Sequence, residues 1–393
     1  MLKLAARGTD TPWYQGWDIT DEKRATFRAT SLAAQFAKRL AVSGECGAPN
    51  HPVYDPRFNP LALMPLQVRN GLRTLSLFSG GGGMDIGFDR AGFEHAANYE
   101  IMEGAGKVLR AAHPNWKVFS GEVGDVREVD WSRYRDQIDV LHGGPPCQPF
   151  SNAGRQNGPS DTRDMIPQFV RAVKAVGPRA FVCENVSGLA TKRFQEYIQS
   201  TIIMPLQREY TIRQFILNAA DFGVPQTRRR VFFVGFANPS EASQFEAPRP
   251  THKHARSDAS SHNLPETMGV REALGLPNNG TDGLSPTLRS GLTGPRHTTS
   301  VLSSVSALRH WNQLGVWPNG VAADRPSASA YVAKNGDYRL SIPDCLLLQG
   351  FPEDWPVQRP VYFALGLIGN SVAPPMAFHL ARAVATALNS DTL

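Results

Sequence analysis

The stretch LRTLSLFSGGGGMDIGF, residues 72–88, decides the fold of this chain. It begins as a short apolar run typical of a buried strand, continues through four glycines at 80–83, and ends as the start of a helix. A strand that enters a glycine-rich turn and then a helix lets backbone N–H groups approach a ligand closely. The pattern indicates a site for a nucleotide or an adenosyl cofactor.

Strands and helices alternate after this stretch. Further apolar runs predict strands at 95–100, 138–144, 179–186, 210–223 and 228–236. The helical patterns KVLRAAHP and MIPQFVRAVKAVGP lie between them. This alternation predicts an α/β fold with a doubly wound, mostly parallel sheet.

Composition divides the chain into four segments. Residues 1–70 form an N-terminal extension with one helix, and residues 71–237 carry the alternating pattern. Residues 238–356 are expected to form a smaller, irregular lobe, because 238–339 are rich in Pro, Ser, Thr, Asn and Gly. Residues 357–393 end the chain with an amphipathic helix.

The overall composition is that of a soluble globular protein. Of the 393 residues, 41% are hydrophobic and 19% are charged. No apolar run suggests a transmembrane helix, and the N-terminus is too polar for a signal peptide, so we expect a cytoplasmic protein without a membrane partner. The net charge of +6 permits a polyanionic partner. The four cysteines lack a zinc-binding spacing, which predicts no metal site.

A second informative stretch is HGGPPCQPFS, residues 142–151. Pro145 and Pro146 fix their φ angles and make the turn rigid. They place Cys147 at the carboxyl end of a strand, the edge where α/β folds bind ligands. A cysteine is more often a buried apolar residue, but this position favours a nucleophile.

Charged residues near two other strand ends would complete such a site. Glu184 follows the apolar strand AFVC, so we expect it to face Cys147 and to donate a proton as the sulfur attacks. In QTRRR, Arg228 and Arg230 point to the same side of an extended chain, where they can orient Glu184 or contact a phosphate. A basic strand at the surface is the alternative interpretation.

Two further acidic residues follow the glycine turn. Glu100 ends the next strand, where a carboxylate can accept hydrogen bonds from ribose hydroxyls, and Asp125 can accept from an adenine amino group or cap a helix. These residues alone are also compatible with a nicotinamide oxidoreductase. That alternative leaves Cys147 and Glu184 without a role.

The ordered set of motifs in this chain resembles that of DNA (cytosine-5)-methyltransferases of the bacterial type II restriction-modification type. The motifs are, in order, FSGGGG, Glu100, GDV, GGPPCQPFS, ENV, QTRRR, LQGFP and GNSV. The resemblance runs from about residue 72 to the C-terminus and leaves only 238–339 unaligned. It implies a Rossmann-like methyltransferase sheet with a smaller target-recognition lobe at 238–356. The chain departs from the family in its long extension, and in IPDC at 342–345, where the family commonly has an Arg-Glu pair.

The resemblance implies a role for each matching residue. S-adenosylmethionine would be bound by Phe78, Gly80, Gly82, Glu100, Asp125, Asn370, Ser371 and Val372. The catalytic residues would be Cys147, Glu184, Arg228 and Arg230. DNA would be contacted by Gln148, Ser151 and Arg163 in a loop after the cysteine. In the unaligned recognition lobe, the polar, glycine-containing loop LRSGLTGPRHTTS makes Arg289, Arg296, His297, Thr298 and Thr299 candidate readers of bases. A phosphate contact or a turn cap is the alternative for Arg296.

The implied reaction acts on a cytosine flipped out of double-stranded DNA. Cys147 would add to C6, Glu184 would protonate N3, and the methyl group would pass to C5. The sequence does not identify the base that removes the C5 proton, for which water is a candidate. The resemblance also implies a monomer, a restriction endonuclease that acts separately, and a location at the bacterial nucleoid.

Two other functions remain as alternatives. A tRNA cytosine methyltransferase of the same fold shares these motifs, but the Cys-Phe-Thr signature usual in that branch does not occur here. A DNA-binding relative without activity is the other, and the intact catalytic positions argue against it.

Overall fold

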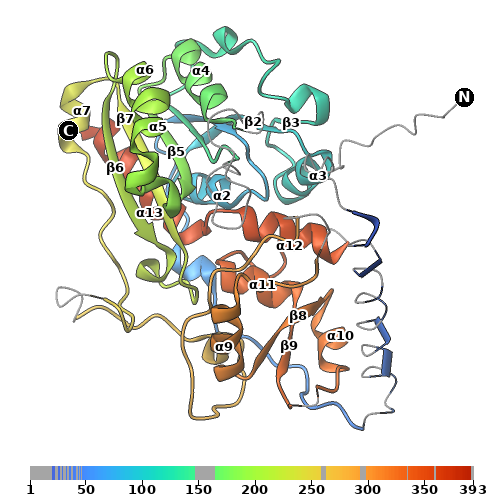
Figure 1. Ribbon diagram of the computed structural model, residues 1–393. Coiled ribbons are helices and arrows are strands. Elements are labelled where there is room, and N and C mark those ends of the chain that lie inside the picture. Colours follow the sequence, from blue (N-terminus) through green and yellow to red (C-terminus); the bar gives the residue numbers. More distant parts are fainter. Residues whose placement is uncertain are drawn as a thin grey trace, which may run out of the picture. The chain divides into compact units, whose positions relative to one another are not determined.

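The computed structural model describes residues 47–146, 164–257, 263–292, 298–333, 335–357 and 360–390, together with single positions of a helical segment between 20 and 45. The chain forms two compact units (Figure 1). The larger unit comprises Pro60–Val224, Arg228–Thr267 and Ser371–Leu393, and the smaller comprises Met1–Asn59, Pro225–Thr227 and Met268–Asn370.

A seven-stranded sheet forms the centre of the larger unit, with the strand order β3-β2-β1-β4-β5-β7-β6. The strands are β1 (Arg73–Leu77), β2 (Glu94–Glu100), β3 (Val118–Ser120), β4 (Val140–Gly143), β5 (Ala180–Val186), β6 (Thr211–Asn218) and β7 (Arg229–Phe236). β1 to β5 pair in parallel, whereas β7 pairs antiparallel with both β5 and β6. The predicted α/β class with a mostly parallel sheet is confirmed.

Helices cover this sheet. The α-helices of the larger unit are α2 (Gly83–Arg90), α3 (Glu103–Ala112), α4 (Ile166–Val176), α5 (Gln195–Ile198), α6 (Met204–Leu206), α7 (Pro239–Gln244) and α13 (Pro374–Leu388). Short 3-10 turns are η1 (Pro60–Leu63), η2 (Gly121–Gly124), η3 (Trp131–Tyr134), η6 (Ser187–Ala190), η7 (Lys192–Phe194) and η9 (Ala219–Phe222), and η8 (Gln199–Ile203) is a π-helical turn. The apolar residues of α4, such as Phe169 and Val173, are buried against Phe181 and Cys183 of β5.

Two glycines allow the last helix to pack on the first helix of the sheet. A Cβ on Gly83 would lie 2.2 Å from the carbonyl oxygen of Val372, and a Cβ on Gly87 would lie 2.6 Å from the Cβ of Ala377. Only glycine permits so close an approach of backbones. The chain before α13, which begins at Pro374, therefore reaches the N-terminal end of α2, next to the glycine turn.

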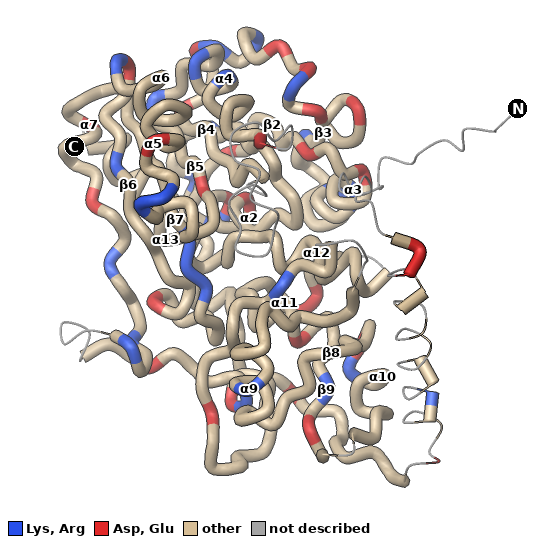
Figure 2. Tube along the Cα trace, viewed as in Figure 1, with Lys and Arg blue, Asp and Glu red and all other residues tan. Residues whose placement is uncertain are grey.

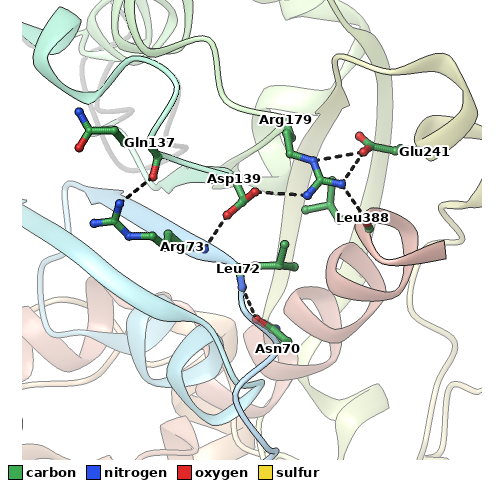
Figure 3. Close-up of polar contacts among 8 residues, drawn as sticks. All are labelled: Asn70, Leu72, Arg73, Gln137, Asp139, Arg179, Glu241 and Leu388. Carbon is green, nitrogen blue, oxygen red and sulfur yellow. Dashed lines mark hydrogen bonds and ion pairs between the residues drawn. The ribbon is translucent and has the colours of Figure 1, made fainter. Parts of the chain in front are cut away.

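Arg179 joins several elements at the amino-terminal edge of the parallel strands (Figure 3). Its guanidinium donates to Glu241 Oε1 of α7 at 2.6 Å, to the carbonyl oxygen of Leu388 at the end of α13 at 2.7 Å, and to Asp139 Oδ1 at 3.3 Å. Asp139 also accepts a hydrogen bond from the backbone N–H of Arg73 at 2.8 Å. A cation at a helix C-terminus is favourable because the last carbonyls carry partial negative charge.

The smaller unit has short elements around a two-stranded sheet. They are α8 (Val270–Ala273), α9 (Val305–Gln313), β8 (Val316–Ala322), α10 (Arg325–Ser329), β9 (Tyr338–Ser341), α11 (Ile342–Gln349) and α12 (Val361–Asn370). Its buried residues include Trp311, Leu340 and Leu348. The segment Val361–Leu388 is long and apolar enough to cross a membrane, but 83% of its most apolar window is buried inside the structure.

The IPDC departure is compensated within the smaller unit. Asp344 and Ser341 form a capping box at the start of α11, and Asp344 also accepts a hydrogen bond from Tyr338. Arg325 of α10 donates to Asp344 at 2.9 Å and to Glu353 at 2.6 Å. The cation that pairs with Asp344 therefore comes from a different element of the smaller unit.

Candidate active site

The glycine-rich turn between β1 and α2 has the backbone that its sequence predicts. Phe78, Gly80 and Gly82 all have positive φ angles, of 57°, 54° and 85°. For the non-glycine residue Phe78, this is an uncommon conformation that functional turns often contain. Hydrogen bonds from Gly82 N–H to the carbonyl of Ser79 and from Ser79 N–H to the carbonyl of Tyr99 fix the turn beside β2.

Glu100 lies at the end of β2 and faces this turn. One carboxylate oxygen accepts from the N–H of Gly80 at 2.7 Å and the other from the N–H of Met102 at 2.8 Å. Burial raises the pKa of Glu100, and these two hydrogen bonds oppose that shift. Each carboxylate oxygen can accept a second hydrogen bond. Glu100 can therefore hold the turn and still accept from ribose hydroxyls.

Asp125 follows η2, which packs directly on the end of β2. A Cβ on Gly124 would lie 2.2 Å from the carbonyl oxygen of Glu100, so the backbone that leads into Asp125 packs against the end of β2. Arg127 binds the Asp125 carboxylate with its backbone N–H and its guanidinium, which lowers the pKa of Asp125. An adenine amino group would compete with Arg127 for this acceptor.

Sequence reasoning missed two exposed apolar residues that lie close to these two acids in the sequence. Ile101 and Val123 are exposed, at 46% and 67%, although both are large and hydrophobic. Ile101 immediately follows Glu100, and Val123 precedes Asp125 by two positions. An apolar ring bound beside the two acids would cover both side chains. An apolar residue directly after an acidic strand end was the signal in the sequence.

The GNSV motif lies where α12 ends and the chain approaches α13. Ser371 and Val372 are buried, whereas Asn370, the last residue of α12, is exposed. Val372 contacts the start of α2 through Gly83, next to the glycine turn. The structure therefore brings Ser371 and Val372 to the same turn as Gly82.

The turn after β4 is attached to β5. The carbonyl oxygen of Pro145 accepts a hydrogen bond from the Asn185 amide at 3.2 Å, and a Cβ on Gly144 would lie 2.7 Å from Glu184 Oε2. Glu184 is thus placed against the residues that lead into Cys147. Cys147 itself lies outside the described residues. Asn185, which the sequence did not single out, fixes the turn through this hydrogen bond.

Glu184 forms a buried ion pair with Arg230. The Arg230 Nε and Glu184 Oε1 atoms are 2.8 Å apart, and the two side chains are only 11% and 9% exposed. Burial raises the pKa of Glu184, and the charges of Arg230 and Arg228 oppose this shift. A carboxyl group whose pKa is raised is suited to donate a proton near neutral pH.

Arg228 is fully buried just before β7, whereas its neighbour Arg229 is exposed. Its guanidinium donates to the carbonyl oxygen of Ser371 at 2.7 Å, and its backbone N–H donates to Asn218. Burial lowers the pKa of Arg228, but arginine remains charged in proteins. The three arginines form a continuous basic segment (Figure 2), from which Arg230 and Arg228 both act on Glu184.

Most predicted DNA contacts fall outside the described residues. Gln148, Ser151, Arg163, Arg296 and His297 lie there. Arg289 is described, in the smaller unit, where its backbone N–H donates to the carbonyl of Val301 and its side chain is half-buried. Among the described residues, no group of three or more His, Cys, Asp or Glu side chains is arranged to hold a metal ion.

Comparisons with known proteins identify the family of this chain. The model of the C-5 cytosine-specific DNA methylase family matches residues 72–386. The Type II methyltransferase M.NgoMIV of Neisseria gonorrhoeae is 32% identical over 81% of this chain and 98% of its own, and M.NaeI of Lentzea aerocolonigenes is 30% identical over 81% and 76%.

Solved structures share the fold. A DNA modification methyltransferase encoded within an E. coli prophage matches 81% of this chain and 100% of its own at 21% identity, with a TM-score of 0.54. The S. pombe Dnmt2 methyltransferase matches 81% and 99% at 15% identity, with a TM-score of 0.53. The family match covers the glycine turn, the strand ends that carry Glu100 and Glu184, and the segment with the three arginines. This chain therefore belongs to the C-5 cytosine-specific DNA methylase family.

Proposed function

We propose that this DNA methylase transfers a methyl group from S-adenosylmethionine to C5 of a flipped-out cytosine within a specific double-stranded DNA sequence, through a covalent bond between Cys147 and C6. The observation that carries the proposal is the contact of Glu184 and Asn185 with Gly144 and Pro145. These contacts support a fixed position for the turn that leads into the nucleophile.

The residues present fit an adenosyl methyl donor. Backbone N–H groups of the positive-φ turn and the remaining acceptor sites of Glu100 would hold it, and Ile101 and Val123 offer an apolar surface for its ring. When bound, S-adenosylmethionine supplies an electrophilic methyl group on a sulfonium.

The protein residues supply the rest of the chemistry. The Cys147 thiolate forms a bond with C6, and the protonated Glu184 carboxyl donates its proton to N3, so that the ring electrons make C5 nucleophilic. After C5 is methylated, loss of the C5 proton, breaking of the Cys147–C6 bond and return of the N3 proton to Glu184 restore the aromatic ring. Arg230 holds Glu184 in place for this step.

The biological setting is part of the same proposal. The Type II names of the sequence relatives support a protective methylase of a bacterial restriction-modification system. Its partner endonuclease would act separately, and the enzyme would work as a monomer in the cytoplasm, at the nucleoid. We assign target recognition to residues 238–356, with Arg289 and Arg296 among its base contacts, and cofactor and catalytic roles to the residues described above.

Bisulfite sequencing of DNA from cells that express the chain tests the activity and reveals the target. Cys147→Ala should abolish methylation and leave cofactor binding intact. A duplex that contains 5-fluorocytosine should trap the wild-type protein covalently, because fluorine at C5 cannot leave as a proton does. Mapping the adduct to Cys46, Cys183 or Cys345 would contradict the mechanism.

A further inference from the structure

Residues 47–59, called the strap here, precede the region that the family model matches. That match begins at residue 72, and M.NgoMIV aligns over 98% of its own length while it covers only 81% of this chain. The strap belongs to the smaller compact unit, to which residues 268–370 also belong. It is therefore an addition, from the other end of the sequence, to the unit that contains residues 268–356 of the proposed recognition lobe.

One end of the strap is bound to α8. The backbone N–H groups of Arg57 and Phe58 both donate to the carbonyl oxygen of Ala273, at 3.0 and 3.2 Å, and Phe58 is buried. Gly275 lies so close that a Cβ there would be 2.0 Å from the carbonyl oxygen of Asp55. This contact leaves no room for a side chain at position 275.

The other end of the strap is bound to β9 and α10. His51 Nε2 lies 2.7 Å from the carbonyl oxygen of Gly336, and the Ser329 hydroxyl donates to the carbonyl oxygen of His51 at 2.6 Å. The rings of His51, Tyr54 and Tyr338 pack together, with centroids 5.6 to 6.1 Å apart. The strap thus connects α8 with α10 and β9, which begin more than 50 residues after the end of α8.

The lobe has little regular structure that would hold these elements without the strap. Its sheet has two strands, β8 and β9, and α8 and α10 contain only four and five residues. A two-stranded sheet is marginally stable by itself, so additional packing must fix its position. Backbone hydrogen bonds at both ends and the buried Phe58 ring provide such packing.

We propose that the strap is a positioning element for DNA recognition, which holds α8, α10 and β9 in the arrangement that engages the target sequence. The proposal rests on the proposed function, because it assigns target recognition to this lobe. Loss of the strap contacts would make the lobe reorganise on each binding event, which weakens DNA binding. Apart from Asn370, the residues proposed to bind the cofactor lie in the larger unit and would be unaffected.

Gly275→Ala in the full chain tests the proposal, because the new methyl group would push Asp55 away. Gly280→Ala is a matched control: Gly275 and Gly280 have similar positive φ angles, +70° and +83°, but nothing lies within 4 Å of a Cβ at position 280. The expected result is a KM for DNA that rises about tenfold in Gly275→Ala relative to Gly280→Ala. The Kd for S-adenosylmethionine should be the same in both, and bisulfite sequencing should show more methylation at near-target sites for Gly275→Ala.

Tyr54 gives a second pair of variants, should Gly275→Ala not fold. Tyr54→Phe keeps the ring contact with Tyr338 and loses only the 3.2 Å hydrogen bond between the Tyr54 hydroxyl and His51 Nδ1, so it should raise the KM for DNA less than Tyr54→Ala. Equal KM values for DNA within each pair, or a cofactor Kd that rises together with that KM, would overturn the proposal. Wild-type methylation is measured alongside: an inactive wild type contradicts the proposed function, whereas an active wild type with unaffected variants contradicts only the role of the strap.

Discussion

Two opposing effects act on the pKa of Glu184. Burial favours the neutral form of the carboxyl group, and the guanidinium groups of Arg230 and Arg228 favour its charged form. Glu184→Gln keeps the size of the side chain but cannot donate a carboxyl proton. We expect methyl transfer to slow by about 10²–10⁴-fold, the usual contribution of general acid catalysis. Single-turnover methylation measures this, and the wild-type rate should fall at high pH as Glu184 loses its proton, whereas the residual rate of the variant should not.

Glu241→Gln is the matched control for this prediction. Glu241 is also a buried glutamate paired with an arginine, but it lies on α7, among residues that have no part in the proposed reaction. Its variant should keep the wild-type rate per folded molecule. Near wild-type turnover in Glu184→Gln would show that another group protonates the ring.

Asp85 in α2 is a buried acid that the mechanism does not use. It accepts a hydrogen bond from Asn98, but its second oxygen has no partner among the described residues, and burial raises the pKa of Asp85 to about 7. Because the folded chain binds this proton more tightly than the unfolded chain, its contribution to stability is full below pH 4 and is lost as the pH rises to 7.

Asp85→Asn should remove this pH dependence. At about 1.36 kcal/mol per pKa unit, the variant should gain up to about 4 kcal/mol over wild type between pH 4 and pH 8. Urea unfolding at several pH values measures the difference. If the free energies of unfolding of Asp85→Asn and wild type differ by the same amount at every pH, the raised pKa of Asp85 is not the cause of the pH dependence.

At the scale of elements, the sequence was most informative where one residue type alone meets a physical need. Glycines at positive φ, prolines before a nucleophile and acids at strand ends are required locally, so the turn at 78–82 and the strand with Glu184 were predictable. Contacts between distant side chains were not. Nothing in the sequence near IPDC indicates that Arg325, 19 residues earlier, would bind Asp344.

Arg325→Met tests whether the ion pair between Arg325 and Asp344 stabilises the start of α11. The change leaves the Asp344 carboxylate, which is 1% exposed, without its cation, and breaking a buried ion pair in this way typically costs about 3–5 kcal/mol. Tyr338 and Ser341 still donate to Asp344, so we expect the lower end of that range. Thermal unfolding measures the loss. Arg309→Met on the exposed face of α9 should change stability by less than about 0.5 kcal/mol, and an equal effect of both variants would contradict the argument.

At the scale of the whole molecule, the residues proposed for the reaction and the ion-pair network around Arg179 lie at opposite edges of one sheet. The proposed site uses the carboxyl ends of β1, β2, β4 and β5, whereas Arg179 and Asp139 lie at the amino ends of β5 and β4. This separation follows from parallel strands, which place all their carboxyl ends on one edge. The alternation of strands and helices in the sequence predicted that the site residues would share one edge. The sequence did not predict the network around Arg179, because that network depends on the C-terminal helix returning to the sheet.

Arg179→Met should therefore destabilise the protein without changing its chemistry. It leaves Glu241 buried, with no cation and with one oxygen that already lacks a partner among the described residues. Because Arg179 is 42% exposed, we expect a loss of about 1–3 kcal/mol rather than the full cost of a buried pair. The double variant Arg179→Met/Glu241→Gln should recover part of this loss, because the buried charge is gone. Urea unfolding measures both, and the Kd for S-adenosylmethionine should equal that of wild type. A weakened Kd in Arg179→Met would show that the two edges of the sheet are energetically coupled.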